Sequence, residues 1–290
     1  MKIKSLVFLI LFAGCSYDNC NIKTNESFKQ ITVQNLITDI YSVNNLSSFN
    51  SFLLENKNVL YPFYEVEDTS FLLDKVANAF TLIDNVYFDS LYNDVNTHFE
   101  NPLNLFYPLD NSFTKFNQQS NYKLSPNITI LISGFFNDVI VDKENIVIGL
   151  DYFLPKTNKY KPRDLPSYIL DRYSPEHINS ISLSSYLSQF NLINESDLTM
   201  INEMISFGKL YYVVSKLLPC TEQRIILCYS EKEFELVNKN EAFIYSFFLQ
   251  NELLFEESNL IKQKYLSERP STFEISQSVP GRIGRWLGWR

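Results

Sequence analysis

The chain has 290 residues, of which 45% are hydrophobic and 20% are charged, a composition typical of a folded globular protein rather than a disordered or polytopic membrane chain. Lys and Arg number 25 against 33 Asp and Glu, and the net charge of -8 has the wrong sign for binding a nucleic-acid backbone. Only 7 glycines and 2 histidines are present, which argues against glycine-rich phosphate loops and most histidine-based sites. We therefore expect a globular protein that does not bind nucleic acid.

The first residues have the pattern of a bacterial lipoprotein signal. Lys2 and Lys4 precede an apolar run at residues 6–12, which is far shorter than the roughly 18 to 20 residues that span a bilayer. Two small residues and Cys15 follow, and the sequence Phe-Ala-Gly-Cys resembles a lipobox, whose cysteine is acylated before cleavage. The other interpretation of Cys15 is a buried core cysteine behind an uncleaved helix. We favour lipidation because of the position of Cys15 directly after the apolar run.

Lipidation sets both the expected compartment and the expected segments of the chain. We predict a lipoprotein signal peptide at residues 1–14, a lipidated tether at 15–25 and one domain at 26–290, with Cys15 as the lipid attachment site. An Asp directly after the lipidated cysteine resembles an inner-membrane retention signal. This chain has Ser16 at that position, so the resemblance to sorting rules favours the outer membrane. We therefore expect a protein of the cell envelope that is attached to the membrane through its N-terminal lipid.

The other cysteines are three in number, which is odd for an oxidising compartment: Cys20, Cys220 and Cys228. Cys220 and Cys228 form a candidate disulfide, because a bond between them would close a short local loop after Pro219. The equal alternative is that the cysteines are buried or idle thiols. The spacing alone leaves both interpretations open.

The first strong helical pattern lies at residues 68–98, where apolar residues recur with a 3.6-residue period behind Asp68 as a candidate N-cap. The following stretch, 101–122, contains two prolines and is predicted to be a loop-like connection. Short β-branched runs then predict a strand followed by a hairpin. These strands are expected at 128–132, 138–141 and 146–148. Together they predict a small sheet within an otherwise helical protein.

Three further helices are predicted after the sheet. Ser174 and Pro175 supply N-cap and first-turn chemistry for a helix that extends to about residue 190. A second helix runs from near 197 to Pro219, which stops it, and a capping box at 230–233 opens a third. No internal repeat or linker divides the sequence. The pattern therefore predicts one helix-dominated α+β domain with a small central β-sheet.

No motif in the sequence supplies a recognisable active site. The sequence lacks a His-Glu-x-x-His zinc motif, a Gly-x-Ser-x-Gly nucleophile elbow and a P-loop. Gly208 and Lys209 lack the flanking residues of a P-loop and are expected inside a helix, where the glycine serves close packing. His98 and His177 lie near helix ends and are not expected to be metal ligands. We therefore predict no catalytic residue, no metal and no cofactor.

The most unusual local chemistry lies at residues 280–290. This segment holds three of the seven glycines, both tryptophans and three arginines, with no acidic residue. Arg282 and Arg285 fall on one side of a helix, while Gly284 and Gly288 leave a flat strip where another backbone can approach. Two interpretations are equally open: a docked terminal helix whose arginines pair with the acidic body, or a surface that binds a partner.

The terminal segment Pro-Gly-Arg-Ile-Gly-Arg-Trp-Leu-Gly-Trp at 280–289, together with the segment at 204–219, resembles the gliding motility lipoprotein GldB family. The runs at 148–154 and 173–178 are similar to further segments of the family in the same order. The resemblance spans roughly residues 128 to 289 together with the lipobox. It marks a candidate partner-binding or structural motif that consists of Gly208, Lys209, Tyr211, Gly281, Arg282, Gly284, Arg285 and Trp286.

The resemblance implies a lipoprotein that is required for gliding motility and linked to type IX protein secretion, with other proteins of that machinery as partners. The family is distantly similar to zinc metallopeptidases of the His-Glu-x-x-His type. Where their metal helix would lie, this chain has Ile-Ser-Leu-Ser-Ser at 181–185, and neither serine nor leucine replaces histidine as a zinc ligand. The resemblance therefore implies a degenerate zincin-like scaffold that is not an enzyme.

Two classes of function remain at this point. A non-enzymatic component of a machine is favoured, with Arg and Trp residues of the terminal segment as binding hot spots. The alternative is a peptidase-like envelope hydrolase with an unrecognised site that uses carboxylates such as Asp151 and Glu203. The metal content of the protein distinguishes the two.

Overall fold

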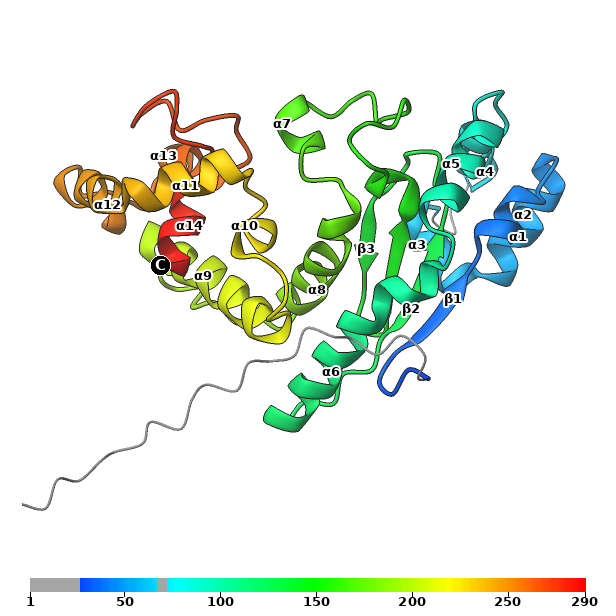
Figure 1. The fold of residues 1–290 in the computed structure, drawn as a ribbon, viewed down its shortest axis with the longest axis horizontal. Helices are drawn as coiled ribbons and strands as arrows, with labels where there is room; N and C mark the ends of the chain where they lie inside the picture. The colour runs from blue at the N-terminus through cyan, green and yellow to red at the C-terminus, as the bar shows by residue number, and fades with distance from the viewer. Residues whose placement is uncertain (1–26, 67–71) are drawn as a thin grey trace, which may run out of the picture.

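The computed structural model describes residues 27–66 and 72–290. The signal peptide, the lipid attachment at Cys15 and the helix cap expected at Asp68 lie outside the described residues. Figure 1 shows the sheet with its surrounding helices in one half of the molecule and a group of helices in the other half. The two halves are joined through α8 (Ile178–Ser188) and α9 (Met200–Leu217), which contact each other.

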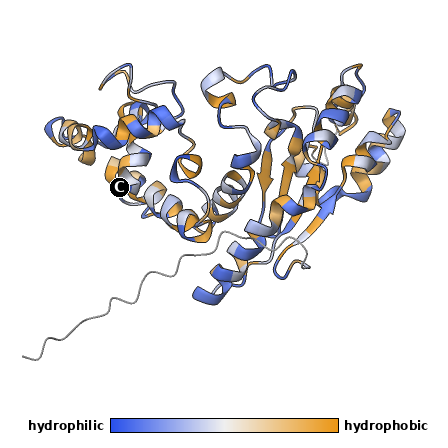
Figure 2. Ribbon diagram, in the orientation of Figure 1, coloured by the Kyte–Doolittle hydropathy of each residue, from blue (hydrophilic) through white to orange (hydrophobic). Residues whose placement is uncertain are grey.

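A four-stranded sheet, in the order β1-β2-β4-β3, forms the centre of the first half. The strands are β1 (Thr32–Asn35), β2 (Asn127–Leu131), β3 (Val139–Val141) and β4 (Asn145–Gly149). The first, second and fourth are parallel, and β3 runs antiparallel to β4. Ile128 lies opposite Ile146 and Ile130 lies opposite Ile148, all fully buried, as expected for a parallel sheet with both faces covered. Figure 2 shows β2, β3 and β4 largely in the orange of hydrophobic residues, whereas β1 is mostly blue.

The strand and the hairpin predicted from the sequence are confirmed by β2, β3 and β4. Strand β1 was not predicted, because its four residues are Thr, Val, Gln and Asn and none is fully buried. The register of β1 is set by the neighbouring strand β2, because Val33 pairs with Ile128.

The described residues between β1 and β2 are mostly helical. They form α1 (Ile37–Tyr41), α2 (Leu46–Glu55), α3 (Lys57–Phe63), α4 (Leu72–Ile83), α5 (Phe88–His98), the 3-10 helix η1 (Pro102–Phe106) and α6 (Tyr107–Gln119). Helix α1 contacts β2, and α3 contacts β4.

Two predictions for this region are wrong in detail. The single helix expected at 68–98 is two helices, because the Asn85 side chain donates to Leu82 O at 2.6 Å and accepts from Tyr87 N at 2.9 Å, which turns the chain between them. The loop expected at 101–122 is η1 and α6. Its prolines lie in the first turns of these helices, where the missing N–H has no helical partner to lose.

After β4, the chain forms helices that are joined by loops. It forms η2 (Leu150–Phe153), α7 (Ser167–Leu170), η3 (Pro175–His177), α8, α9, α10 (Gln223–Ile226), α11 (Glu231–Lys239), α12 (Glu241–Gln250), η4 (Leu253–Phe255), α13 (Asn259–Leu266) and α14 (Ile283–Trp289). The three predicted helices are confirmed, although the third is divided at Asn240 into α11 and α12. The capping box is present, with Ser230 N donating to Glu233 Oε2 at 2.8 Å.

Helix α14 packs along α9 through direct backbone contact. A Cβ atom on Gly208 would lie 2.1 Å from Gly288 O, and a Cβ atom on Gly288 would lie 2.0 Å from Met204 O. Trp286 is fully buried beside this contact. Of the flat strip predicted from the glycine spacing, Gly288 is therefore covered by α9, and Gly284 is covered by Tyr265 and Leu266 of α13. Both contacts support the interpretation of the terminal segment as a docked helix.

One hydrophobic core contains residues of both halves, from Ile31 near β1 to Trp286 on α14. The described residues thus form a single α+β domain, as predicted, with a small mixed sheet and a majority of helices. Within the described ranges, no helix combines the length and the apolar character that crossing a membrane requires.

We predict that Gly208→Ala lowers the free energy of unfolding by about 2 kcal/mol, because the added methyl group forces α14 away from α9. Helix propensity alone predicts the opposite sign, a gain of up to about 1 kcal/mol. Urea denaturation followed by circular dichroism measures the change, and Lys216→Ala on the exposed side of α9 serves as the control with an effect near zero. A more stable Gly208→Ala protein would contradict the backbone contact.

Candidate functional site

The residues that the resemblance marks come together around α9 and α14. Gly208, Lys209 and Tyr211 lie on α9, and Gly281 to Trp286 lead into α14. Tyr211 and Trp286 are buried, whereas Lys209 is exposed and donates to Leu192 O at 2.7 Å. The motif is therefore mostly internal to the fold.

Arg282 is the N-cap residue of α14, where the terminal segment changes direction. Its φ of 61° is left-handed, and Gly281 before it passes so close to Arg269 that a Cβ atom would lie 2.0 Å from the Arg269 carbonyl oxygen. The buried guanidinium donates to Leu227 O at 2.9 Å and to Cys228 O at 2.8 Å. Arg282 thus fixes the loop after α10 against the start of α14.

Glu268 is the shared partner of three arginines. Its carboxylate is hydrogen-bonded to Arg172 and lies 3.2 Å from Arg282 Nε and 3.3 Å from Arg285 Nη1. Burial acts to raise the pKa of Glu268, but Arg282, Arg172 and Arg285 outweigh it and hold the pKa below its ordinary value. We call these four residues the Glu268 cluster. It joins α14 to the segments that carry Arg172 and Glu268.

A pocket of about 290 Å³ opens beside the Glu268 cluster, and Arg172, His177, Cys228 and Arg282 are among its lining residues. His177 is buried, and its Nδ1 atom lies 2.8 Å from Ser174 Oγ. Burial, together with Lys156, Arg224 and Arg172, lowers the pKa of His177 to about 4, so the ring is neutral at pH 7.

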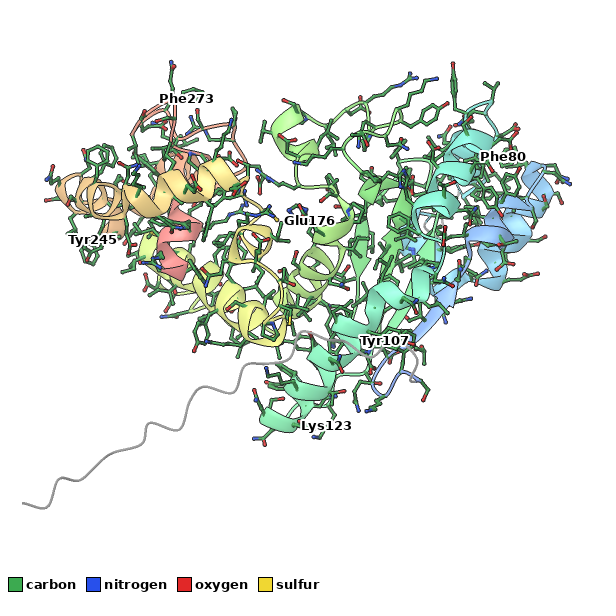
Figure 3. The ribbon with its side chains drawn as sticks, in the orientation of Figure 1. Phe80, Tyr107, Lys123, Glu176, Tyr245 and Phe273 are labelled. Carbon is green, nitrogen blue, oxygen red and sulfur yellow. The ribbon has the colours of Figure 1, made fainter. Side chains whose placement is uncertain are left out.

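Ser174 and His177 do not form a nucleophile and base of the triad type. The nearest carboxylate, Glu176, lies 3.9 Å from the same Nδ1 atom that contacts Ser174. A triad needs its acid and its hydroxyl on opposite ring nitrogens, so this arrangement gives no relay through the ring. Figure 3 shows Glu176 at the junction between the two halves of the molecule. The hydrogen bond therefore serves to position the start of α8.

Cys228 is a free thiol, so the predicted disulfide between Cys220 and Cys228 is wrong. Helix α10 lies within the loop that this bond would have closed, and Cys220 is disulfide-bonded. Burial raises the pKa of the Cys228 thiol, which makes it a weak nucleophile at neutral pH.

Asp151 follows β4 and is almost completely buried, with 1% of its surface exposed. Its carboxylate accepts hydrogen bonds from Ser133 N at 2.8 Å, Ser133 Oγ at 3.0 Å and Phe135 N at 2.7 Å. Burial raises the pKa of Asp151, and these hydrogen bonds act against the rise. Asp151 therefore ties the loop after β2 to the end of β4.

Glu203, the second carboxylate of the alternative hydrolase site, has a different set of partners. It lies on α9 and pairs with the buried Lys262 of α13. Asp151 and Glu203 thus serve separate pairs of elements, and none of their contacts brings them together.

The segment at 181–185 lies on α8, where Ser182 and Leu183 are buried and the other three residues are partly buried. The Ser182 hydroxyl has no hydrogen-bond partner among the residues that the structure describes. In the part of the chain that the structure describes, no three His, Cys, Asp or Glu side chains form a group that could hold a metal ion.

Glu268, the shared carboxylate of the cluster, and Arg172, one of its three arginines, were not predicted from the sequence. Arg172 is 96 residues from Glu268 in the sequence, so no local pattern connects them. The available signal was the run of arginines without acids in the terminal segment, which required a carboxylate from elsewhere in the fold.

We predict that Glu268→Ala lowers the free energy of unfolding by about 2 kcal/mol, because three arginines lose one shared carboxylate that is partly screened by solvent. Thermal and urea unfolding measure the loss. Glu274→Ala, which removes the partner of Arg269 alone, is the matched control and should cost less than 1 kcal/mol. Equal losses in the two variants would argue against a special role of the cluster.

His177 makes the stability of the protein depend on pH. Its pKa is lowered on folding, so between pH 6.5 and about 4 the unfolded chain binds a proton that the folded chain does not bind. The free energy of unfolding therefore falls as the pH falls through this range. We expect His177→Gln to remove up to about 3 kcal/mol of this fall. Urea denaturation at pH 7 and pH 4.5 measures it, with exposed His98→Gln as the control. A wild-type slope in His177→Gln would exclude His177 as the source.

Comparison with known sequences identifies the family of the chain. No curated protein and no solved structure matches it. The sequence model of the family described as Gliding motility protein GldB matches residues 18–290, which include the Glu268 cluster and every residue that the structure describes. The zincin-like part of the earlier resemblance stays a prediction. The chain belongs to the GldB family of gliding motility lipoproteins.

Proposed function

We propose that this chain is an outer-membrane-associated lipoprotein that is required for gliding motility, is linked to type IX protein secretion and acts without catalysing a reaction. The observation that carries the proposal is membership of the gliding motility family over residues 18–290. Family membership supports the role in motility. The family resemblance implies the link to secretion, the lipobox-like sequence supports membrane attachment, and the use of the buried polar groups supports the absence of catalysis.

The sequence before the domain supports attachment to the outer membrane. Cys15 directly follows a short apolar run and two small residues, an arrangement that resembles a lipobox. The next residue is Ser16 rather than an Asp, and an Asp at that position resembles an inner-membrane retention signal. Two or more acyl chains anchor a protein stably to a bilayer, whereas a single chain binds only marginally and reversibly.

The use of the buried polar groups supports a role other than catalysis. Asp151 binds two backbone N–H groups and a hydroxyl, and Arg282 binds two backbone carbonyl oxygens. His177 is held neutral against Ser174. Each group is thus engaged in joining segments of the fold, and a structural requirement accounts for its burial.

The partners that we propose are other proteins of the gliding and secretion machinery. Arg282 and Trp286 have 4% and 0% of their surfaces exposed, so they support the shape of the C-terminal half and do not contact a partner directly. We therefore expect exposed side chains, such as Lys209 on α9, to contact the partners.

Deletion of the gene, followed by complementation, tests the proposal. We expect deletion to abolish colony spreading and secretion of type IX cargo, wild type to restore both, and Cys15→Ala to restore neither and to incorporate no radiolabelled fatty acid. Cys228→Ser, which changes a cysteine inside the fold, is the control and should restore both. Normal spreading and secretion after deletion would refute the proposal.

Metal analysis of the purified full-length protein tests the absence of catalysis separately. The proposal expects no stoichiometric metal. One zinc ion for each chain, together with hydrolysis of a peptide substrate, would refute this part and favour the envelope hydrolase.

A further inference from the structure

A cleft of about 710 Å³ lies at the edge of the sheet where the parallel strands β2 and β4 end. Its walls come from Gly134 and Phe135 after β2, from residues 82–91 between and within α4 and α5, and from residues 159–164 after η2. In Figure 1, α4, α5 and the loop after β4 lie at the same end of the sheet. The carboxyl ends of parallel strands are the usual place for ligands in open sheets, and the volume is typical of a binding site.

The backbone at the base of this cleft is strained. Gly134 has a φ of 68° and Phe135 a φ of 61°, and the left-handed region is costly for a bulky side chain, by about 1–3 kcal/mol. Three contacts hold Phe135 in place: its N–H donates to Asp151, its carbonyl accepts from Tyr152 OH at 2.7 Å, and its ring meets the Tyr152 ring edge-on. The buried Asp151 therefore holds a loop that presents Phe135 to the cleft.

The cleft has an apolar floor and an aromatic rim. Phe88 and Leu91 are buried, and Leu82 and Phe135 are partly buried beside them. The rings of Tyr87 and Tyr160 stand 6.0 Å apart, and 55% of Tyr87 is exposed. Exposed aromatic groups beside an apolar floor are typical of recognition surfaces.

The charge of the cleft is opposite to that of the protein. Lys159, Lys161 and Arg163 line it against one carboxylate, Asp164, whereas the whole chain carries -8. Among the described residues, neither Lys159 nor Arg163 has a carboxylate within ion-pair distance, and Lys159 lies 5.3 Å from the centre of the Tyr160 ring. These cations thus differ from Arg172, Arg282 and Arg285, which share Glu268.

We propose that this cleft binds an acidic peptide segment of a partner protein, with an apolar side chain on the floor and carboxylates against Lys159 and Arg163. The aliphatic side chains of Leu82 and Leu91 on the floor fit an apolar amino-acid side chain better than a sugar ring, which stacks on an open aromatic face. The cations at the rim select acidic partners and raise the rate of encounter with them.

Fluorescence anisotropy with the full-length protein in detergent tests this proposal independently of motility. The probe is a fluorescein-labelled octapeptide of alternating Glu and Leu. We expect saturable binding that weakens with added salt and that weakens about tenfold in Lys159→Glu/Arg163→Glu. Lys239→Glu/Lys264→Glu, which makes the same charge change at exposed sites on α11 and α13, should bind as wild type does.

A second variant keeps the test valid if charge reversal disturbs folding. Tyr87→Ser changes an exposed ring at the rim and should weaken binding about threefold without changing the unfolding midpoint. Equal binding of a Lys-Leu octapeptide, equal effects of the two charge-reversal pairs, or binding of polygalacturonate without binding of the peptide would each overturn the proposal.

Discussion

The contact between the backbones of α9 and α14 is the constraint on which the C-terminal half depends. With Gly208 against Gly288 and Gly288 against Met204, the two helices leave no room for a side chain at these positions. This approach places Arg282 at the start of α14, where its guanidinium reaches the carbonyl oxygens of the loop after α10. The Glu268 cluster and the small pocket beside it are therefore consequences of how closely these two helices pack.

Much of the fold follows from local patterns, and the rest depends on contacts between distant segments. The strand at 128–132 and the capping box at Ser230 could be predicted because their signals lie within a few residues. The break at Asn85 depends on one side chain bonding to nearby backbone, which hydrophobic periodicity does not detect. Among the residues of the candidate site, those of the terminal segment were predicted from its unusual composition. Its partner Glu268 was not, because long-range pairing leaves no trace in either local sequence.

The two basic regions of this acidic protein differ in what neutralises them. In the Glu268 cluster, Arg282 is buried and its charge is met by a carboxylate and backbone oxygens of the same chain. In the cleft at the sheet edge, Lys159 and Arg163 are exposed to solvent. Buried and compensated charge favours a fixed internal geometry, whereas solvated charge favours attraction of something from outside. A gliding motility lipoprotein can in this way combine a rigid body with a surface available for assembly.

The pairing of α9 with α14 also determines the order in which the chain can fold. The two glycines that meet are about 80 residues apart in the sequence. The packing of α9 is therefore complete only after α14 has been made. The parallel strand pairs of the sheet half all come from residues before 150, which are made earlier. During synthesis, the residues of all four strands and of α9 are therefore complete before the segment that covers the glycine face of α9. This interval is when a chaperone or a protease would find the C-terminal half most accessible.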